Sequence, residues 1–230
     1  MLLLTIIIII FITLFCLWRF LFFFRNPKRD IPYNDTQMLS PADGLIIYIK
    51  EVIPGEAIFS IKGENKILLK DLMFSDDPSL FNKPGYLIGI YMSVFDVHYN
   101  RAPIHGHIKK IAHDFPTNKK ENKTMLNAFD NLTYNLNPLW NECDYLITNE
   151  RASYLIKNNK HSVYVTQIAD RWVKKIVTLK NEETINQGEV FGLIKMGSQV
   201  DIFIPQKNNI KILVKERQHV KAGITPLLEI

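Results

Sequence analysis

Cysteine is scarce in this chain, and its placement excludes a disulfide scaffold. Only two of the 230 residues are cysteines, Cys16 inside an apolar run and Cys143 in the polar part of the chain, so we do not expect them to meet. No Cys/His spacing is typical of a zinc site, and the absence of a disulfide framework fits a reducing cytosol. RNA- and DNA-binding motifs are also missing, although the net charge is +5. We therefore expect no metal and no nucleic-acid partner.

Charged side chains are absent from residues 1–18, MLLLTIIIIIFITLFCLW, and apolar residues continue past Arg19 to residue 24. A helix of 18 to 24 residues spans roughly 27–36 Å, about the hydrocarbon thickness of a bilayer. A secretory signal peptide would need a basic start and a small-residue cleavage site, and the sequence has neither. Residues 1–25 are therefore predicted to be an uncleaved membrane anchor.

Basic residues flank this run on one side only, at Arg19, Arg25, Lys28 and Arg29. The positive-inside rule then places the rest of the chain in the cytoplasm, and the cationic collar suits anionic lipid headgroups. Residues 26–39 contain Asn26-Pro27 and Ile31-Pro32, which interrupt a helix and predict a basic linker. We expect a protein of the cell membrane whose soluble part faces the cytoplasm.

From residue 40 onward the chain has mainly strand-like segments, rich in β-branched and aromatic residues. They are residues 45–49, 57–61, 86–92, 162–169, 173–179, 200–205 and 210–214. Residues 117–150 are polar, rich in Asn and without a clean period, so we expect a long loop with one short helix there. The pattern predicts a mainly β (α+β) domain over residues 40–230.

A weak internal repeat links residues 179–194 with residues 214–230. Each copy has a charged stretch, a glycine (Gly188 or Gly223) and then an apolar strand, and the glycines suit turns with positive φ. Two such lipoyl-like hairpins side by side predict a β-sandwich or barrel-like hybrid. This pattern sets a fold and not an activity.

Two segments carry side chains suited to proton transfer. In the SPADG turn at 40–44, Pro41 and Gly44 project Asp43; an ordinary turn is the alternative. In the segment at 93–107, alternation in an extended chain puts Asp96 and His98 on one face, where a carboxylate can orient a basic histidine. A hydrogen-bonded structural histidine is the alternative there.

Two further segments are singled out by their residue types. Asn149-Glu150-Arg151 suits an ion pair or a structural turn. Gly197-Ser198 lies between two strand-like segments, and a glycine allows a strained turn in which the neighbouring serine hydroxyl approaches the Gly197 carbonyl. Attack by Ser198 Oγ on that carbonyl would turn the amide into an ester, although a Gly-Ser pair alone is usually a hairpin turn.

Taken together and in this order, the segments resemble the short form of the phosphatidylserine decarboxylase family. The quoted stretches are FFRNPKRDIP, SPADG, FDVHYNRAPIHG, NERASYLI, VTQIADRWVKKI and GLIKMGSQVDIFIP. The resemblance covers nearly the whole chain and is weakest at 117–148. Its specific parts are the Gly-Ser segment and the DVHYNRAP segment.

The resemblance implies a proenzyme that cuts itself between Gly197 and Ser198. The products would be a β chain of residues 1–197 and an α chain of residues 198–230, which would stay together as a heterodimer. Ser198 would become a covalent pyruvoyl group that forms a Schiff base with the amine of phosphatidylserine. Its electron sink would replace pyridoxal phosphate as carbon dioxide leaves and phosphatidylethanolamine forms.

The resemblance also suggests roles for individual residues. Asp43 and His98 become candidates for self-cleavage and proton transfer, beside Ser198. Longer relatives carry a second histidine where this chain has Arg101, so the base that drives self-cleavage stays open between His98 and another group. Arg101 and Asn100 are candidates for binding the substrate phosphate or carboxylate, and a structural ion pair is the alternative for Arg101.

Two other functions remain open at this point. A pyruvoyl-dependent decarboxylase of a soluble amino acid would share the Gly-Ser cleavage but would not need the anchor. A membrane-anchored adaptor with lipoyl-like hairpins would be no enzyme, and would present a modified lysine such as Lys195 at a hairpin tip.

Overall fold

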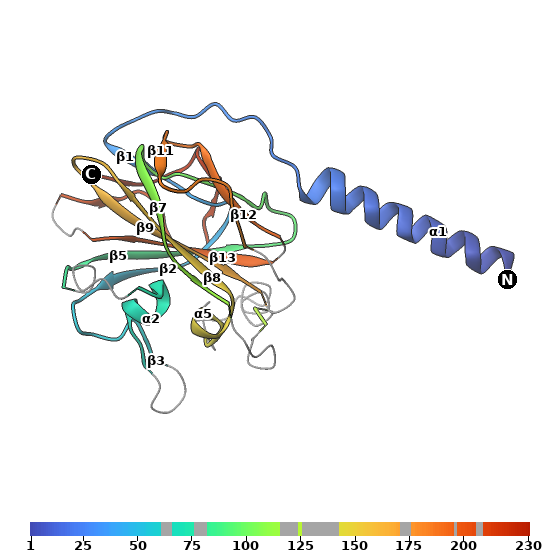
Figure 1. Cartoon of the computed structure of the whole chain (residues 1–230), viewed down its shortest axis with the longest axis horizontal. Helices are drawn as coiled ribbons and strands as arrows, with labels where there is room; N and C mark the ends of the chain where they lie inside the picture. The colour runs from blue at the N-terminus through green and yellow to red at the C-terminus, as the bar shows by residue number, and fades with distance from the viewer. Residues whose placement is uncertain are drawn as a thin grey trace.

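A computed structural model describes residues 1–60, 66–75, 82–115, 124–125, 143–170, 176–195, 197–205 and 209–230. The chain starts with an exposed α-helix, α1 (Leu2–Leu17), which continues as a π-helix, η1 (Trp18–Phe23). Figure 1 shows α1 projecting away from the body of the molecule, with the N-terminus at its far end. Leu2–Phe23, with a mean hydropathy of 2.7, is the one helix in the described residues that is long and apolar enough to cross a membrane.

The body is built around an eight-stranded antiparallel sheet, ordered β11-β7-β8-β9-β13-β5-β2-β15. Its strands are β2 (Gly44–Val52), β5 (Gly85–Met92), β7 (Gly106–Asp114), β8 (Arg151–Lys157), β9 (Ser162–Ala169), β11 (Glu183–Ile185), β13 (Ser198–Ile204) and β15 (His219–Val220). The sheet is open, because β11 and β15 are its two ends and do not pair with each other. The prediction of a mainly β fold is confirmed, and the sheets do not close into a barrel.

Smaller elements cover this sheet. One three-stranded sheet has the order β1-β16-β14 and another the order β10-β12-β6, while β3 pairs with β4. Their bounds are β1 (Gln37–Leu39), β3 (Phe59–Ser60), β4 (Lys66–Ile67), β6 (Tyr99–Arg101), β10 (Ile176–Thr178), β12 (Val190–Ile194), β14 (Lys211–Ile212) and β16 (Pro226–Glu229). The short helices are α2 (Leu69–Met73) and α5 (Tyr145–Thr148).

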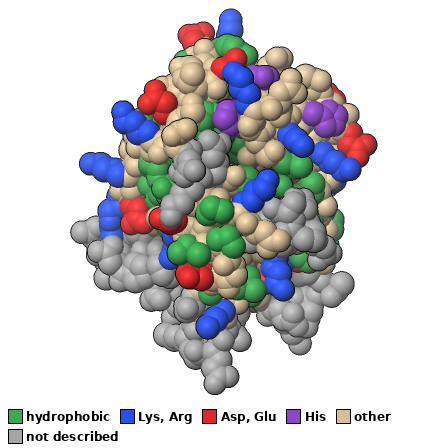
Figure 2. All heavy atoms as spheres, turned by 90° about the vertical axis from the view of Figure 1, so that its left-hand side faces the viewer, with side chains coloured by type: hydrophobic (Ala, Val, Ile, Leu, Met, Phe, Trp, Pro, Cys, Tyr) green, Lys and Arg blue, Asp and Glu red, His purple; other side chains and the backbone are tan. Residues whose placement is uncertain are grey.

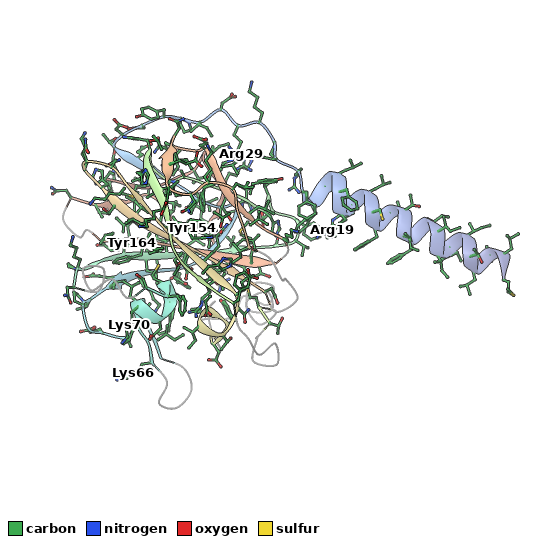
Figure 3. All side chains as sticks on the ribbon, viewed as in Figure 1. Arg19, Arg29, Lys66, Lys70, Tyr154 and Tyr164 are labelled. Carbon is green, nitrogen blue, oxygen red and sulfur yellow. The ribbon has the colours of Figure 1, made fainter. Side chains whose placement is uncertain are left out.

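The central sheet separates two apolar cores, because successive side chains of a strand point to opposite faces. Tyr154 on β8 belongs to one core and Tyr164 on β9 to the other; both are labelled in Figure 3. The first core lies between the central sheet and the two small sheets, and the second is covered by α2 and α5. Alternation along β13 therefore sends Ser198 toward one side and its neighbour Gln199 toward the other.

The predicted strands at 45–49, 86–92 and 162–169 are confirmed within β2, β5 and β9, and the strand predicted at 200–205 corresponds to β13, which ends at Ile204. The prediction for 173–179 is met by β10 at 176–178, and residues 173–175 lie outside the described residues. For the expected loop at 117–150, only its end and residues 124–125 are described, and α5 supplies one short helix. The strands β7 and β8 were not predicted, because their polar residues interrupt the alternation of apolar and polar side chains that indicates a strand.

The internal repeat extends far beyond the two segments that revealed it. Two series of seven strands pair in the same way: β6-β7-β8-β9-β10-β11-β12 and β1-β2-β5-β13-β14-β15-β16. In the first series β12 lies between β10 and β6, and in the second β16 lies between β14 and β1. Even loop contacts are exchanged: Leu39 N–H donates to the Pro103 carbonyl, and Arg101 N–H donates to the Pro41 carbonyl. The domain is therefore a duplicated unit, with one copy inserted between β5 and β13 of the other.

Gly188 and Gly223 have φ of +77° and +70°, as predicted for turns that need a glycine. The two turns lie side by side, because a Cβ built on Gly223 would be 3.3 Å from Gly188 Cα. The repeat segments are, however, not hairpins with their own strand pairing in the described residues. The strand β11 pairs with β7, and β12 pairs with β10 and β6.

The linker after η1 is packed on the domain. The side chain of Ile31 lies against both Gly188 and Gly223, and Arg29, labelled in Figure 3, forms an ion pair with Asp43. Arg25 donates to the Phe95 carbonyl. These contacts hold the end of the apolar helix against the loops that contain the predicted site residues.

Candidate active site

Ser198 is the first residue of β13 and is held on both sides by strand pairing. Its neighbours across the ladder are Met92 at the end of β5 and Ala169 at the end of β9. The side chain is fully buried, and Ser198 Oγ lies 3.3 Å from Met92 Sδ. A sulfur is a weak hydrogen-bond acceptor, so the hydroxyl is not committed to a strong partner.

Gly197 adopts a left-handed conformation with φ of +40°. A residue with a Cβ would be strained there. The Gly197 carbonyl accepts a hydrogen bond of 3.0 Å from Asp170 N–H, just beyond the paired end of β9. The carbonyl that the sequence predicts as the point of attack is therefore already bound by an N–H donor.

His98 is buried next to this end of the sheet, between β5 and β6. Its Nδ1 lies 2.9 Å from the Asp96 carbonyl oxygen, so Nδ1 carries the proton and Nε2 has the free lone pair. Among the described residues Nε2 has no hydrogen-bond partner. Burial lowers the pKa of His98 to about 4, against the weaker opposing effect of the Asp96 carbonyl. The neutral imidazole at pH 7 can accept a proton.

The sequence predicted that the Asp96 carboxylate orients His98, and the structure differs. That carboxylate bonds Ser93 N–H and Ser93 Oγ, and it lies 2.8 Å from His219 Nε2. The backbone carbonyl of Asp96 holds the imidazole instead, because the chain turns between Ser93 and Asp96 and is not extended there.

Phe23, the last residue of η1, packs on the His98 ring. The two ring centroids are 4.2 Å apart, and Phe23 is fully buried although the rest of the apolar helix is mostly exposed. The sequence predicted Phe23 as part of the anchor and did not predict this contact, because nothing in an apolar run distinguishes the side chain that packs on the domain. The helix end therefore covers the histidine.

Asp43 is buried in an ion pair. Its carboxylate accepts hydrogen bonds from Arg29 at 2.6 and 2.7 Å, and from Ala222 N–H at 2.7 Å. The negative charge of Asp43 also acts on His98, where it makes a small contribution that raises the histidine pKa. Asp43 thus lies close enough to influence His98, while its hydrogen bonds connect the linker to the turn before β16.

Asn100 and Arg101 point to different surroundings. Asn100 is fully buried; its Nδ2 is 3.8 Å from Met92 Sδ, and its Oδ1 accepts a 2.6 Å hydrogen bond from Gln167. Asn100 therefore shares Met92 with Ser198. The Arg101 guanidinium donates to the Gly188 carbonyl and to Asn26 Oδ1. Both acceptors are neutral, so these contacts are structural hydrogen bonds and not the ion pair considered as its alternative.

The Asn149-Glu150-Arg151 segment contains the expected ion pairs. Glu150 Oε1 lies 3.0 Å from His113 Nε2 and accepts from Ile176 N–H, while Arg151 pairs with Asp114. Within the described residues no cluster of three or more His, Cys, Asp or Glu side chains could hold a metal ion. Figure 2 shows Lys and Arg mixed with Asp and Glu on the face that points away from α1, without one basic patch.

Comparison with known proteins places the chain in a family. The sequence model described as phosphatidylserine decarboxylase matches residues 17–227. A phosphatidylserine decarboxylase proenzyme of Carboxydothermus hydrogenoformans is 32% identical over 89% of this chain and 76% of its own length. A second, of Syntrophus aciditrophicus, is 30% identical over 94% of this chain and 79% of its own length. The resemblance predicted from the motifs is confirmed, and the chain belongs to the phosphatidylserine decarboxylase family.

Proposed function

We propose that this chain is a proenzyme that cuts itself between Gly197 and Ser198 and then decarboxylates phosphatidylserine to phosphatidylethanolamine. The observation that carries the proposal is the local geometry at 197–198, in a chain of this family. A glycine with φ of +40° precedes a buried serine, and its carbonyl is hydrogen-bonded to Asp170 N–H. The hydrogen bond polarises the Gly197 carbonyl and so favours attack on the peptide bond, and a glycine adopts this left-handed turn without strain.

Self-cleavage proceeds by an acyl shift and an elimination. Ser198 Oγ loses its proton to a base and attacks the Gly197 carbonyl carbon; the C–N bond breaks, the Ser198 nitrogen takes up a proton, and an ester forms. Loss of the Ser198 Cα proton then breaks the Cβ–Oγ bond of the ester, which leaves Gly197 as a carboxylate and residue 198 as dehydroalanine. Cβ takes up a proton to give an imine. Water hydrolyses the imine, ammonia leaves, and residue 198 becomes a pyruvoyl group.

The surroundings of Ser198 fit a group that must stay fixed after the cut. Residue 198 pairs with Met92 on one side and with Ala169 on the other, so its position does not depend on the broken bond. The Ser198 side chain is fully buried before the cut. When present, the pyruvoyl carbonyl supplies the electron sink for loss of carbon dioxide from an amino acid.

His98 is the side chain suited to return a proton to the substrate carbon. Its Nε2 has no hydrogen-bond partner in the described part of the chain, and its Nδ1 is fixed by the Asp96 carbonyl, so one nitrogen can take and give the proton while the other holds the ring. His98 is our candidate for this step, and it is also a candidate base for self-cleavage. Asp43 contributes charge from a distance and anchors the linker.

The apolar helix suits a substrate that does not leave the bilayer. Phe23 and Arg25 join the helix end to His98 and to Phe95. The predicted site is therefore tied to the place where the chain would leave the membrane. We propose residues 1–25 as the anchor, residues 26–39 as the linker and residues 40–230 as the catalytic domain, on the cytoplasmic side of the cell membrane.

The function is tested by carbon dioxide release from detergent-purified protein. We expect release from vesicles that contain phosphatidylserine and none from free serine or aspartate. Turnover of a free amino acid without turnover of the lipid would instead favour the soluble-substrate decarboxylase. Active material whose carbonyl groups do not react with hydroxylamine or borohydride would contradict the pyruvoyl mechanism.

A further inference from the structure

Asn149 is a buried polar side chain that neither the ion pairs nor the proposed proton transfers use. It follows α5 and is fully buried. Its Nδ2 donates a hydrogen bond of 2.9 Å to the Ala169 carbonyl, while its Oδ1 lies 3.3 Å from Thr148 Oγ1. Because a carbonyl oxygen only accepts hydrogen bonds, the N–H₂ end of the amide is the one directed at Ala169.

The Ala169 carbonyl and the Asp170 N–H belong to the same peptide group. The Asn149 amide donates to the carbonyl end of that group, and its N–H end donates 3.0 Å to the Gly197 carbonyl. One peptide plane therefore joins Asn149 to the bond that is cut. The Ala169 N–H, which donates to the Glu150 carbonyl at 2.9 Å, holds the same strand end in place.

Hydrogen bonds in such a chain strengthen one another. A donor on a peptide oxygen shifts electron density toward that oxygen and makes the N–H of the same group a better donor, by roughly 10–30% per bond. Attack of Ser198 Oγ turns the Gly197 carbonyl oxygen into an oxyanion, so a stronger Asp170 N–H bond stabilises the transition state more than the starting peptide.

We propose that Asn149 is a positioning residue for self-cleavage, which polarises the Gly197 carbonyl through the Ala169–Asp170 peptide group. The proposal rests on the proposed function, because it concerns the same bond. The Asp170 N–H is the group that touches the reacting carbonyl, and Asn149 acts through it. This gives the first residue of the Asn149-Glu150-Arg151 segment a role distinct from the ion pairs of the other two.

The test follows cleavage of newly made chains over time, by cell-free synthesis with detergent and a denaturing gel. Asn149→Ala and Asn149→Asp should both be cut about tenfold more slowly than the wild type at pH 8. Loss of a whole oxyanion donor costs roughly 100- to 1,000-fold, and here the donor remains and only its polarisation is lost. At pH 5 the cleavage rate of Asn149→Asp should return toward that of the wild type at the same pH, because a protonated carboxyl group can donate to the Ala169 carbonyl. Asn149→Ala should still be cut slowly at pH 5.

Ser153→Ala is the matched control. Ser153 is also buried on β8, and its hydroxyl shares a 2.8 Å hydrogen bond with Thr166, so the variant loses a buried bond without touching the Ala169–Asp170 peptide. We expect it to be cut at the wild-type rate. Equally slow cleavage of Ser153→Ala would show a general loss of stability and overturn the proposal.

Two further outcomes also decide the question. Wild-type rates for both Asn149 variants would overturn the role of Asn149 and leave self-cleavage intact. Failure of the Asn149→Asp chain to recover at pH 5 would likewise contradict polarisation by a donated hydrogen bond. If the wild-type chain itself stayed uncut while it decarboxylated lipid, the proposed function would fall first, and that result is distinguishable from both.

Discussion

Replacing Phe23 by Ala should expose His98 and raise its pKa. Burial is the main reason that the histidine pKa falls from 6.5 to about 4. That difference corresponds to about 3 kcal/mol against protonation, at 1.36 kcal/mol per pKa unit. The Phe23 ring covers one face of the imidazole at 4.2 Å, so its removal should return somewhat less than half of the effect. We expect a rise of about one unit.

The assay is an NMR titration of isotopically labelled histidine in the detergent-solubilised chain, with His98 assigned from His98→Ala. Phe20→Ala is the matched control, because Phe20 is another ring on the same helix and is 69% exposed. Its substitution should leave the His98 midpoint where it is in the wild type. A midpoint near 4 in Phe23→Ala would refute the contact as the cause of the burial.

The remaining predictions concern single side chains. His98→Ala should abolish lipid decarboxylation, and normal carbon dioxide release would contradict the role of His98 in proton transfer. A denaturing gel of the same sample shows whether self-cleavage also needs His98. Arg29→Met leaves the buried Asp43 carboxylate without its ion-pair partner and should cost about 3–5 kcal/mol in urea unfolding; an unchanged midpoint would speak against the pair. Burial raises the pKa of Asp201 to about 7, so the folded state favours the protonated carboxyl group. The free energy of unfolding should therefore fall by up to about 4 kcal/mol as pH rises from 4 to 7. Asp201→Asn should therefore be more stable than wild type at pH 8 and not at pH 4; the same difference at both values would refute this.

The motifs predicted the family, and they single out the proposed cut site, because both depend on local sequence. A Gly-Ser pair between two strands and a histidine after a strand are visible along the chain, and the positive φ of Gly188 and Gly223 follows from glycine chemistry. The strands with regular alternation were also recognisable. The mainly β architecture could therefore be predicted from residues close in sequence.

The contacts around the site could not be predicted, because they join distant segments. Asp170 reaches the Gly197 carbonyl through the register of β9 against β13, and a one-residue shift would remove that bond. Phe23 reaches His98, and Arg29 reaches Asp43, only because the linker folds back over the domain. The duplication was visible as a short repeat, while its full extent appears only in the order of the strands.

Intact mass of purified, active protein is the direct test of self-cleavage. We expect two chains, residues 1–197 and residues 198–230, and the smaller one should begin with a pyruvoyl group that blocks Edman degradation. Ser198→Ala should give a single full-length chain without activity. A single uncut chain in fully active wild-type material would show that activity does not depend on cleavage at Gly197-Ser198.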